Sequence, residues 1–265
     1  MKKLFAVLVA FAAISMPFAV YAETSDFIIN DGCVEKYTGT DENVVIPSVS
    51  DGAAVTSIGS SCFSGNESIK SIFIPASIEE IWQDNLADYG SYPFLYMPKL
   101  ESIEVDAENS YFTSDNGVLI DKMTSTLLYY PENKADEVYY VSDNVQAVRS
   151  LAFNKCNNLK ELYITNNDTS FGAMSIGYGN SFTIYCYVGS SAELYAGNDF
   201  AVKYIVNTGD ANADGFITAN DCTFILSKAL DGGFEIKVNE KAFDINGDGK
   251  ITADDAALLL SNILD

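Results

Sequence analysis

Near the C-terminus, carboxylate and carboxamide side chains recur twice at a spacing that can bind a hard divalent cation. In a twelve-residue calcium loop, positions 1, 3, 5 and 12 supply side-chain oxygens, position 7 supplies a backbone carbonyl, and Gly at position 6 permits the sharp turn. The first loop offers Asp210, Asn212, Asp214, Phe216 and Asp221. The second offers Asp244, Asn246, Asp248, Lys250 and Asp255. These ligand sets predict two bound Ca²⁺ ions.

A single Asp-x-Asn-x-Asp-Gly stretch is more often an acidic turn than a metal site, so the duplication decides the interpretation. Each loop leads into a stretch with apolar residues at matching helical positions: Cys222, Phe224, Ile225, Leu226 and Leu230 against Ala256, Leu258, Leu259, Leu260 and Leu264. Position 8 of each loop, Ile217 or Ile251, is expected to tie the loop to the interior. Position 12 is Asp instead of the longer Glu, which disfavours an opening of the calmodulin type.

The segment Ala201 to Gly209 predicts a strand and a turn, so no helix enters the first loop. Two loop-helix units without an entering helix resemble a dockerin, and the resemblance implies a cohesin domain of a scaffold protein as partner. It places the cohesin contacts at loop positions 10 and 11 and helix positions 17, 18 and 22. In the first half these are Ala219, Asn220, Leu226, Ser227 and Leu230; in the second they are Ala253, Asp254, Leu260, Ser261 and Asp265. Either half can dock.

The region before the loops is a repeat that cannot bury its own apolar face. The pattern of residues 55–74 returns at residues 145–164, with Phe63 and Phe153 at one fixed place and Asn66 or Cys156 at another. Such a repeat of roughly 23 residues must stack on its neighbours. With the pairs Ile46-Pro47 and Ile74-Pro75 and the stretch Ser57-Ile58-Gly59-Ser60-Ser61-Cys62-Phe63, it resembles a leucine-rich repeat of the bacterial surface-antigen type over about 31–206.

Two departures from the repeat define the architecture further. Residues 109–131 carry Asn116-Gly117 between two apolar runs, which predicts a β-hairpin insertion with a type I′ turn. Residues 182–206 are similar to the terminal repeat that closes such a solenoid. The expected fold is therefore α+β and multidomain: residues 23–206 form a short leucine-rich-repeat solenoid with a hairpin insertion and a cap, and residues 207–265 form a small all-α dockerin with two EF-hand-like calcium loops.

The N-terminus predicts secretion. Lys2 and Lys3 precede an apolar core from Leu4 to Ile14, and Val20 and Ala22 fit a cleavage site, so residues 1–22 are expected to be a signal peptide. The core is shorter than the roughly 20 residues that span a bilayer, and we expect no transmembrane segment in the mature chain. The formal net charge of −22 argues against a nucleic-acid partner, because phosphate binding requires clustered Lys and Arg.

Cysteine and histidine usage narrows the chemistry. The odd set of five cysteines contains no Cys-x-x-Cys pair, and Cys62, Cys156 and Cys222 fall at interior positions, where buried free thiols are expected. One disulfide remains compatible with the sequence. The chain has no His, which removes Ser-His and Cys-His nucleophile pairs and the usual zinc sites. Carboxylate pairs such as Glu79-Glu80 remain as glycosidase candidates, but solvated acidic side chains are the simpler interpretation. We predict no catalytic residue.

The predicted strands offer a different kind of site. Strand alternation turns the middle residue of each short strand away from the core, onto the sheet face that solenoids use for binding. This gives an expected ligand face of Phe73, Glu104, Tyr140 and Tyr163 for a protein or carbohydrate. Simple shielding of the sheet by these side chains is the alternative.

Together these features predict a secreted, extracellular, non-catalytic subunit associated with a cell-surface cellulosome. Its dockerin would bind a scaffold cohesin and display the repeat module, in a system that degrades plant polysaccharide. Two alternatives remain open. One is a dockerin-bearing hydrolase, either a glycoside hydrolase or a protease, since dockerins are most often attached to enzymes. The other is an adhesin that binds a polysaccharide or a host surface.

Overall fold

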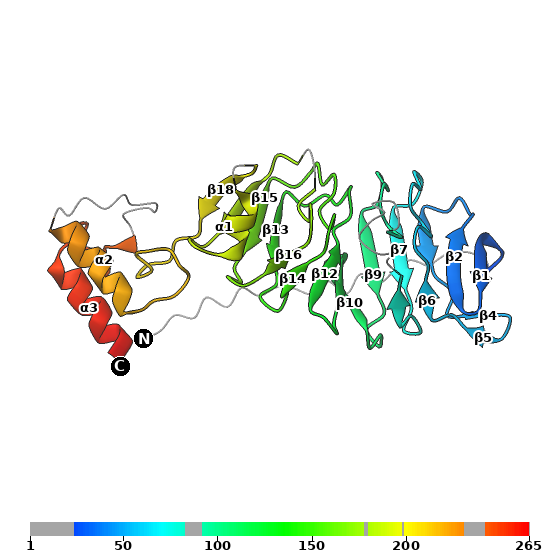
Figure 1. Cartoon of the computed structure of the whole chain (residues 1–265), viewed down its shortest axis with the longest axis horizontal. Helices are drawn as coiled ribbons and strands as arrows, with labels where there is room; N and C mark the ends of the chain where they lie inside the picture. Colours follow the sequence, from blue (N-terminus) through cyan, green and yellow to red (C-terminus); the bar gives the residue numbers. More distant parts are fainter. Residues whose placement is uncertain (1–23, 83–91, 178–179, 198, 231–241, 265) are drawn as a thin grey trace.

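The computed structural model describes residues 24–82, 92–177, 180–197, 199–230 and 242–264. Short strands stack along the long axis of an elongated molecule, and the pair of helices α2 and α3 lies at the C-terminal end (Figure 1). The expected signal peptide lies outside the described residues. Within them, no helix combines the length and the apolar character that crossing a bilayer requires.

The repeat coils build two series of narrow, mainly parallel sheets. Four-residue strands form most of one series, in the orders β3-β7-β9 and β13-β15-β17-β18. Their bounds are Asn43–Val45 (β3), Ser71–Ile74 (β7), Ser102–Val105 (β9), Val138–Val141 (β13), Glu161–Ile164 (β15), Thr183–Cys186 (β17) and Ala201–Tyr204 (β18). Strands of two to five residues form the other series, in the orders β1-β2-β6-β8 and β10-β11-β12-β14-β16. Their bounds are Phe27–Asn30 (β1), Cys33–Tyr37 (β2), Ser57–Ile58 (β6), Glu80–Ile81 (β8), Phe112–Asp115 (β10), Val118–Asp121 (β11), Thr126–Tyr129 (β12), Ala147–Val148 (β14) and Ser170–Phe171 (β16).

Strand alternation explains how each coil contributes to the core. In β7, Ile72 and Ile74 are buried while Ser71 and Phe73 are only half-buried, and β15 repeats this pattern. Because successive side chains of a strand point to opposite faces, one face of every coil packs inward and the other stays accessible. A small antiparallel pair, β4 (Val49–Ser50) and β5 (Ala53–Ala54), and a single turn of 3₁₀ helix at Thr24–Asp26 complete the N-terminal part.

The interior divides into two clusters where the hairpin interrupts the coils. In the first cluster, Tyr37, Phe63, Phe94 and Tyr129 stack in sequence with ring centroids 5.8, 5.9 and 6.0 Å apart. In the second, Tyr130 stacks on Phe153 at 5.2 Å. Adjacent residues of one chain thus belong to different clusters, with Tyr129 in the first and Tyr130 in the second.

The predicted hairpin is present. Strands β10 and β11 pair antiparallel, with Asp115 opposite Val118. The connecting residues Asn116 and Gly117 have φ values of 50° and 79°. Two positive φ angles in a two-residue loop are the signature of a type I′ turn, which matches the twist of the flanking strands.

The solenoid ends in a short helix, α1 (Ser191–Ala196), followed by β18. Ser190 caps this helix by accepting the Glu193 N–H. The five cysteines are all free, and Cys62, Cys156 and Cys222 are buried as expected. Cys186, whose burial was not predicted from the sequence, is buried as well.

The C-terminal module has a core of its own. Helices α2 (Ala219–Ala229) and α3 (Ala253–Leu264) pack together around buried residues that include Cys222, Ile225 and Leu259. The residues before Asp210 form β18 and a turn, so no helix enters the first loop, as predicted. The expectation for Ile217 is wrong: its side chain is 48% exposed and reaches only the edge of the core, beside Gly209, whereas Ile251 packs against the core.

Candidate functional site

The two candidate calcium loops are built from the same hydrogen bonds. At position 12, Asp221 accepts the backbone N–H groups of Ala211 (2.8 Å), Asn212 (3.2 Å) and Thr218 (2.8 Å). Asp255 accepts the equivalent three groups in the second loop. Both carboxylates are fully buried. Each therefore ties the beginning of its loop to the start of the following helix.

Positions 1, 3 and 5 also repeat. Asp210 accepts the Asp214 N–H at 3.0 Å and the Gly215 N–H at 3.1 Å, and Asp244 accepts the Asp248 N–H at 3.1 Å and the Gly249 N–H at 2.9 Å. In both loops, the Asn of position 3 accepts the position 5 N–H, and the Asp of position 5 accepts the position 7 N–H. These bonds curl each loop around the side-chain oxygens that would face a cation.

The electrostatics of the first loop fit a cation. Burial, together with the carboxylates of Asp221 and Asp214, raises the pKa of Asp210 to about 6, against the opposing pull of its amide donors. In the second loop, the N–H groups of Thr252, Asn246 and Ile245 outweigh burial and hold the pKa of Asp255 below its ordinary value. Across the described residues, no three acidic or cysteine side chains form a converged metal cluster. A calcium loop does not require such a cluster, because the neutral oxygens of the position 3 Asn side chain and the position 7 backbone carbonyl complete its ligand set.

The first loop rests on the end of the solenoid, and this contact distinguishes it from the second. The Val188 N–H donates to the Ala213 carbonyl at 2.7 Å, and the Asn167 carboxamide donates to the Asp214 carbonyl, also at 2.7 Å. The Tyr187 ring packs so closely on Gly215 that a Cβ there would lie 2.8 Å from a ring carbon. Ala213 is buried, whereas its counterpart Gly247 is exposed. The terminal repeat and the module thus meet at the first loop.

Most of the residues expected to contact cohesin lie on the outside of the module. Leu226, Leu230 and Leu260 have exposed side chains, at 39%, 81% and 40%. Ala219, Asn220, Ala253, Asp254 and Ser261 are also exposed, and Ser227 is half-buried. Asp265 lies outside the described residues. Leucines left on the surface of a small helical module form an apolar surface suited to a partner protein.

The expected ligand face falls on two separate sheets. Phe73 lies beside Glu104 on β7 and β9, where the Glu104 carboxylate accepts the Ser114 hydroxyl at 3.1 Å. Tyr140 lies beside Tyr163 on β13 and β15. The structure brings the residues together as two pairs, and these pairs do not form one continuous column.

Two further residues, Tyr185 and Lys203, extend the pair of Tyr140 and Tyr163. Neither was predicted from the sequence as part of the ligand face. The rings of Tyr140, Tyr163 and Tyr185 stack at centroid distances of 4.4 and 4.3 Å, and the Lys203 ammonium lies 5.5 Å from the Tyr185 ring. Glu161 accepts hydroxyl hydrogen bonds from Tyr163 and Tyr185. Tyr185 has the same mid-strand position as Tyr163, so the alternation rule could have found it. We call Tyr140, Tyr163 and Tyr185 the tyrosine strip.

Comparison with known families accounts for both regions. The model of the BspA type leucine rich repeat region matches six copies over residues 29–116 and 130–185. The chain belongs to this family. Residues 208–264 match the dockerin type I domain, so this leucine-rich-repeat protein carries a dockerin at its C-terminal side. Neither match is a catalytic domain. No curated protein matches the chain.

Solved structures of bacterial leucine-rich-repeat proteins are similar to part of this chain. The pneumococcal vaccine antigen PcpA is 18% identical over 58% of this chain and 54% of its own, with a TM-score of 0.38. A leucine-rich repeat protein from Eubacterium ventriosum is 21% identical over 66% of this chain and 59% of its own, with a TM-score of 0.36. A leucine rich cell surface protein from Faecalibacterium prausnitzii is 16% identical over 59% of this chain and 71% of its own, with a TM-score of 0.28. The chain spans less than two-thirds of the first two structures.

The family assignments give the coarse function. Dockerin type I domains bind calcium and cohesin domains, which implies a cellulosome-type assembly, and leucine-rich repeats are protein-binding modules. Both point to an extracellular or cell-surface protein.

Proposed function

We propose that this protein is a secreted, non-catalytic subunit of a cellulosome-type complex that serves the degradation of plant polysaccharide. Its dockerin binds a cohesin domain of a scaffold, and its solenoid presents a binding surface. The observation that carries this proposal is the pair of loops in which positions 1, 3, 5 and 12 accept the same backbone hydrogen bonds, each followed by a helix with exposed leucines.

Each loop holds one Ca²⁺. Asp210, Asn212, Asp214, Asp221 and the Phe216 carbonyl serve the first ion; Asp244, Asn246, Asp248, Asp255 and the Lys250 carbonyl serve the second. Calcium supplies the positive charge that clustered aspartates require before a loop can close. The chain contributes the amide network that holds the ligands in place.

Cohesin docks on the surface of one helix at a time. The first-half surface is Ala219, Asn220, Leu226, Ser227 and Leu230, and the second-half surface is Ala253, Asp254, Leu260, Ser261 and Asp265. The solenoid contacts positions 4, 5 and 6 of the first loop, and none of these positions belongs to either docking surface. Both surfaces are therefore compatible with the contact at the cap, and dual-mode docking is supported.

The test is calcium-dependent capture of the full chain on an array of scaffold cohesins. We expect Asp210→Ala combined with Asp244→Ala to abolish capture while the β-sheet circular dichroism of the solenoid persists. Leu226→Ala and Leu260→Ala, made singly and together, report on the docking surface. If either half docks, only the double leucine variant loses capture. Binding that survives chelation of calcium would refute the proposal.

For the solenoid, we propose that the tyrosine strip binds a protein. Tyr163 is stacked on both faces by Tyr140 and Tyr185, so its ring faces are not open to a sugar. Tyr140 remains 62% exposed. A stack of rings that ends in an exposed tyrosine suits the side chains of a partner protein. An adhesin function is the second candidate, and binding of the full chain to insoluble cell wall that Tyr140→Ala abolishes would favour it.

A further inference from the structure

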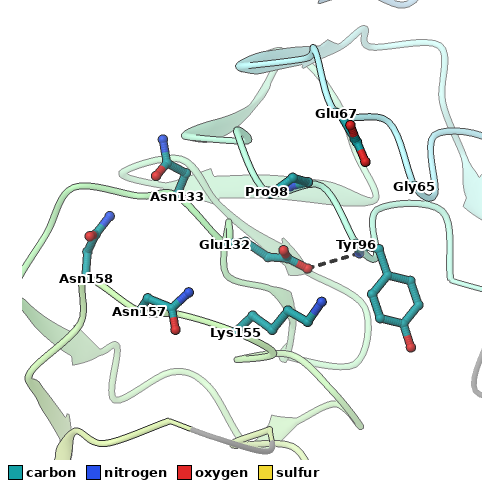
Figure 2. Close-up of a pocket in the computed structure, with 9 residues that line it drawn as sticks. All are labelled: Gly65, Glu67, Tyr96, Pro98, Glu132, Asn133, Lys155, Asn157 and Asn158. Atoms are coloured by element: carbon teal, nitrogen blue, oxygen red, sulfur yellow. Dashed lines mark hydrogen bonds between the residues drawn. The ribbon is translucent and has the colours of Figure 1, made fainter.

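A hollow of about 300 Å³ opens on the side of the solenoid between the coil of Phe94 and the coil of Phe153. Tyr96, Pro98, Glu132 and Lys155 line it together with asparagines (Figure 2). We call it the Tyr96 pocket. Its lining residue Glu132 follows Tyr130 by two positions in the chain. The core changes from the first cluster to the second at this point, between Tyr129 and Tyr130.

The pocket exists because a side chain replaces a backbone bond between coils. On one side of it, the Gly65 N–H donates to the Leu95 carbonyl at 2.9 Å. At the next step, the equivalent donor, the Tyr96 N–H, reaches the Glu132 carboxylate at 3.0 Å instead of a carbonyl (Figure 2). The inserted carboxylate is only 5% exposed. The coils are therefore joined here through a carboxylate at the floor of the hollow.

Tyr96 and Lys155, at the mouth of the pocket, have backbone conformations that favour glycine. Gly65, Tyr96 and Lys155 each follow a buried Phe by two residues, and their φ angles are 78°, 58° and 55°. A residue other than Gly in this left-handed region costs roughly 1 kcal/mol. The Lys155 ammonium nevertheless lies 4.9 Å from the centroid of the Tyr96 ring, so the two side chains form an ordered cation–π pair at the pocket.

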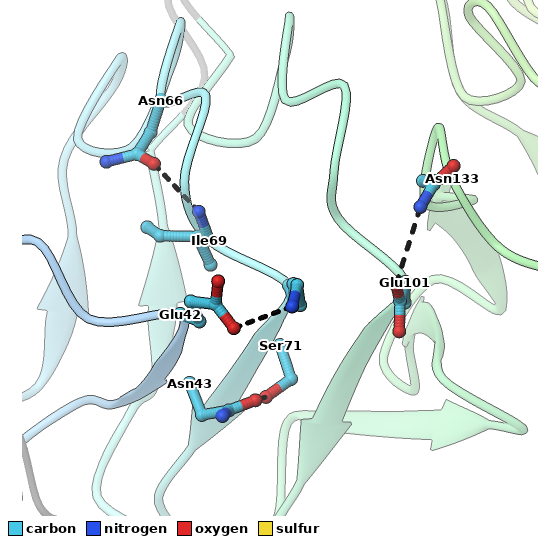
Figure 3. Close-up of polar contacts among 8 residues, drawn as sticks. Glu42, Asn43, Asn66, Ile69, Ser71, Glu101 and Asn133 are labelled. Atoms are coloured by element: carbon cyan, nitrogen blue, oxygen red, sulfur yellow. Dashed lines mark hydrogen bonds and ion pairs between the residues drawn. The ribbon is translucent and has the colours of Figure 1, made fainter.

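The walls are held in place by contacts of their own. Asn66 accepts the Ile69 N–H at 3.0 Å (Figure 3). It also accepts the Ser68 N–H at 2.8 Å, and the two bonds fix the turn that carries Glu67. Asn133 is joined to Glu101 (Figure 3). The carboxamide of Asn157, in contrast, is exposed and makes no hydrogen bond within the described residues. A rigid wall with an unengaged carboxamide is a preorganised hydrogen-bonding surface.

The charges and the size select the ligand. Glu67 and Glu132 outnumber the single cation Lys155, so the pocket disfavours an anionic ligand. A carboxylate and the unengaged carboxamide of Asn157 can bind hydroxyl groups, while Tyr96 and Pro98 offer an apolar surface to C–H groups. The volume lies at the lower limit of ligand pockets. We infer that the Tyr96 pocket binds one neutral sugar ring.

This site is separate from the cohesin surfaces and from the tyrosine strip, so the inference does not depend on the proposed function. It can be tested by titrating the full chain, in calcium, with glucose, galactose, mannose and xylose, followed by calorimetry and amide NMR. A ligand with so few non-hydrogen atoms is expected to bind with a Kd on the order of 1 mM. Oligosaccharides of the same sugars form the second arm. Binding of the free sugar indicates a monosaccharide ligand, whereas binding confined to oligosaccharides indicates the end of a glycan chain.

Variants assign the binding to the pocket. Glu132→Gln retains an acceptor for the Tyr96 N–H but loses the charge-assisted bond to a sugar hydroxyl, and we expect about tenfold weaker binding. Asn157→Ala removes only an exposed carboxamide and should weaken binding several-fold without affecting the fold. Asn144→Ala, which removes an exposed carboxamide of the solenoid outside the pocket, is the matched control and should bind normally.

Three outcomes would overturn the inference. One is the absence of binding by any neutral sugar, free or in a chain, at concentrations well above 1 mM. Another is binding that Asn144→Ala weakens while Glu132→Gln and Asn157→Ala do not. The third is tighter binding of glucuronate or inorganic phosphate than of the neutral sugars, which would contradict the charge argument.

Discussion

Asp221 and Asp255 combine two tasks in one side chain. Each would ligate a metal ion, and each also accepts three backbone N–H groups of its loop through hydrogen bonds that are buried or partly buried. A buried donor left unsatisfied costs about 1–3 kcal/mol. The position 12 carboxylate therefore stabilises the module by hydrogen bonding in addition to any contribution from calcium.

Asp255→Ala should lower the stability of the C-terminal module by several kcal/mol at saturating calcium, because three amides lose their acceptor. Chemical denaturation followed by far-UV circular dichroism measures the change. Asp254→Ala is the matched control, since Asp254 is the adjacent, exposed carboxylate and accepts no hydrogen bond among the described residues. It should alter stability by less than about 0.5 kcal/mol. Equal effects of the two substitutions would refute this role.

The buried Glu132 carboxyl should make the stability of the solenoid depend on pH. Burial raises the pKa of this carboxyl above its ordinary value, against the opposing effects of Lys155 and its hydrogen-bond donors. The folded state then binds the proton more tightly than the unfolded state, so stability falls as pH rises between the two pKa values. The Glu132→Gln side chain cannot ionise, so this variant avoids the loss of stability at high pH. The variant should be relatively more stable at neutral pH, and its advantage should shrink as pH falls through the folded-state pKa.

Denaturant titrations of both proteins between neutral and acidic pH measure that difference. Glu67→Gln, which removes an exposed carboxylate at the same pocket, controls for the change in net charge. An advantage of Glu132→Gln that stayed constant with pH would contradict the assignment of the buried carboxylate.

At the scale of elements, local rules made the loops and strands predictable. The hairpin turn and the buried faces of the repeats follow from chemistry within a few residues, and they are present as expected. The Tyr96 pocket could not be predicted, because it depends on a hydrogen bond between Tyr96 and Glu132 across the hairpin insertion. The outward position of Ile217 depends likewise on how the first loop is packed.

The contact between the terminal repeat and the first loop also joins distant parts of the sequence. Asn167 and Val188 hold two consecutive carbonyls of the loop, those of Asp214 and Ala213. The second loop has no such support within the described residues. The cap should therefore preorganise the first calcium site in particular.

Asn167→Ala should weaken calcium binding at the first loop by about fivefold and leave the second unchanged, since one hydrogen bond contributes about 1 kcal/mol. Calcium titrations that follow the amide resonances of Gly215 and Gly249 separate the two sites. Asn144→Ala, an exposed Asn of the solenoid whose side chain makes no hydrogen bond in the described structure, is the control. Equal weakening at both glycines would show that the cap does not act selectively.

At the scale of the molecule, the separate cores determine how the protein unfolds. The buried cluster around Ile225 and Leu259 is distinct from the two clusters of the solenoid, and it is small. A hydrophobic core of this size stabilises a domain only slightly, and bound metal ions are one way in which small domains gain the missing stability. Each calcium at a hundredfold excess over its Kd adds about 2.7 kcal/mol.

Chelation of calcium should therefore unfold the C-terminal module and leave the solenoid intact. Differential scanning calorimetry of the full chain should show two transitions in calcium, and EGTA should abolish or lower one of them. The repeats are held by aromatic stacking and by backbone bonds between coils, neither of which involves the loops, so the other transition should shift little. Asp210→Ala with Asp244→Ala should reproduce the effect of EGTA in the presence of calcium. A single transition that moved as a whole would mean that the contact at Asn167 and Val188 couples the two parts into one cooperative unit.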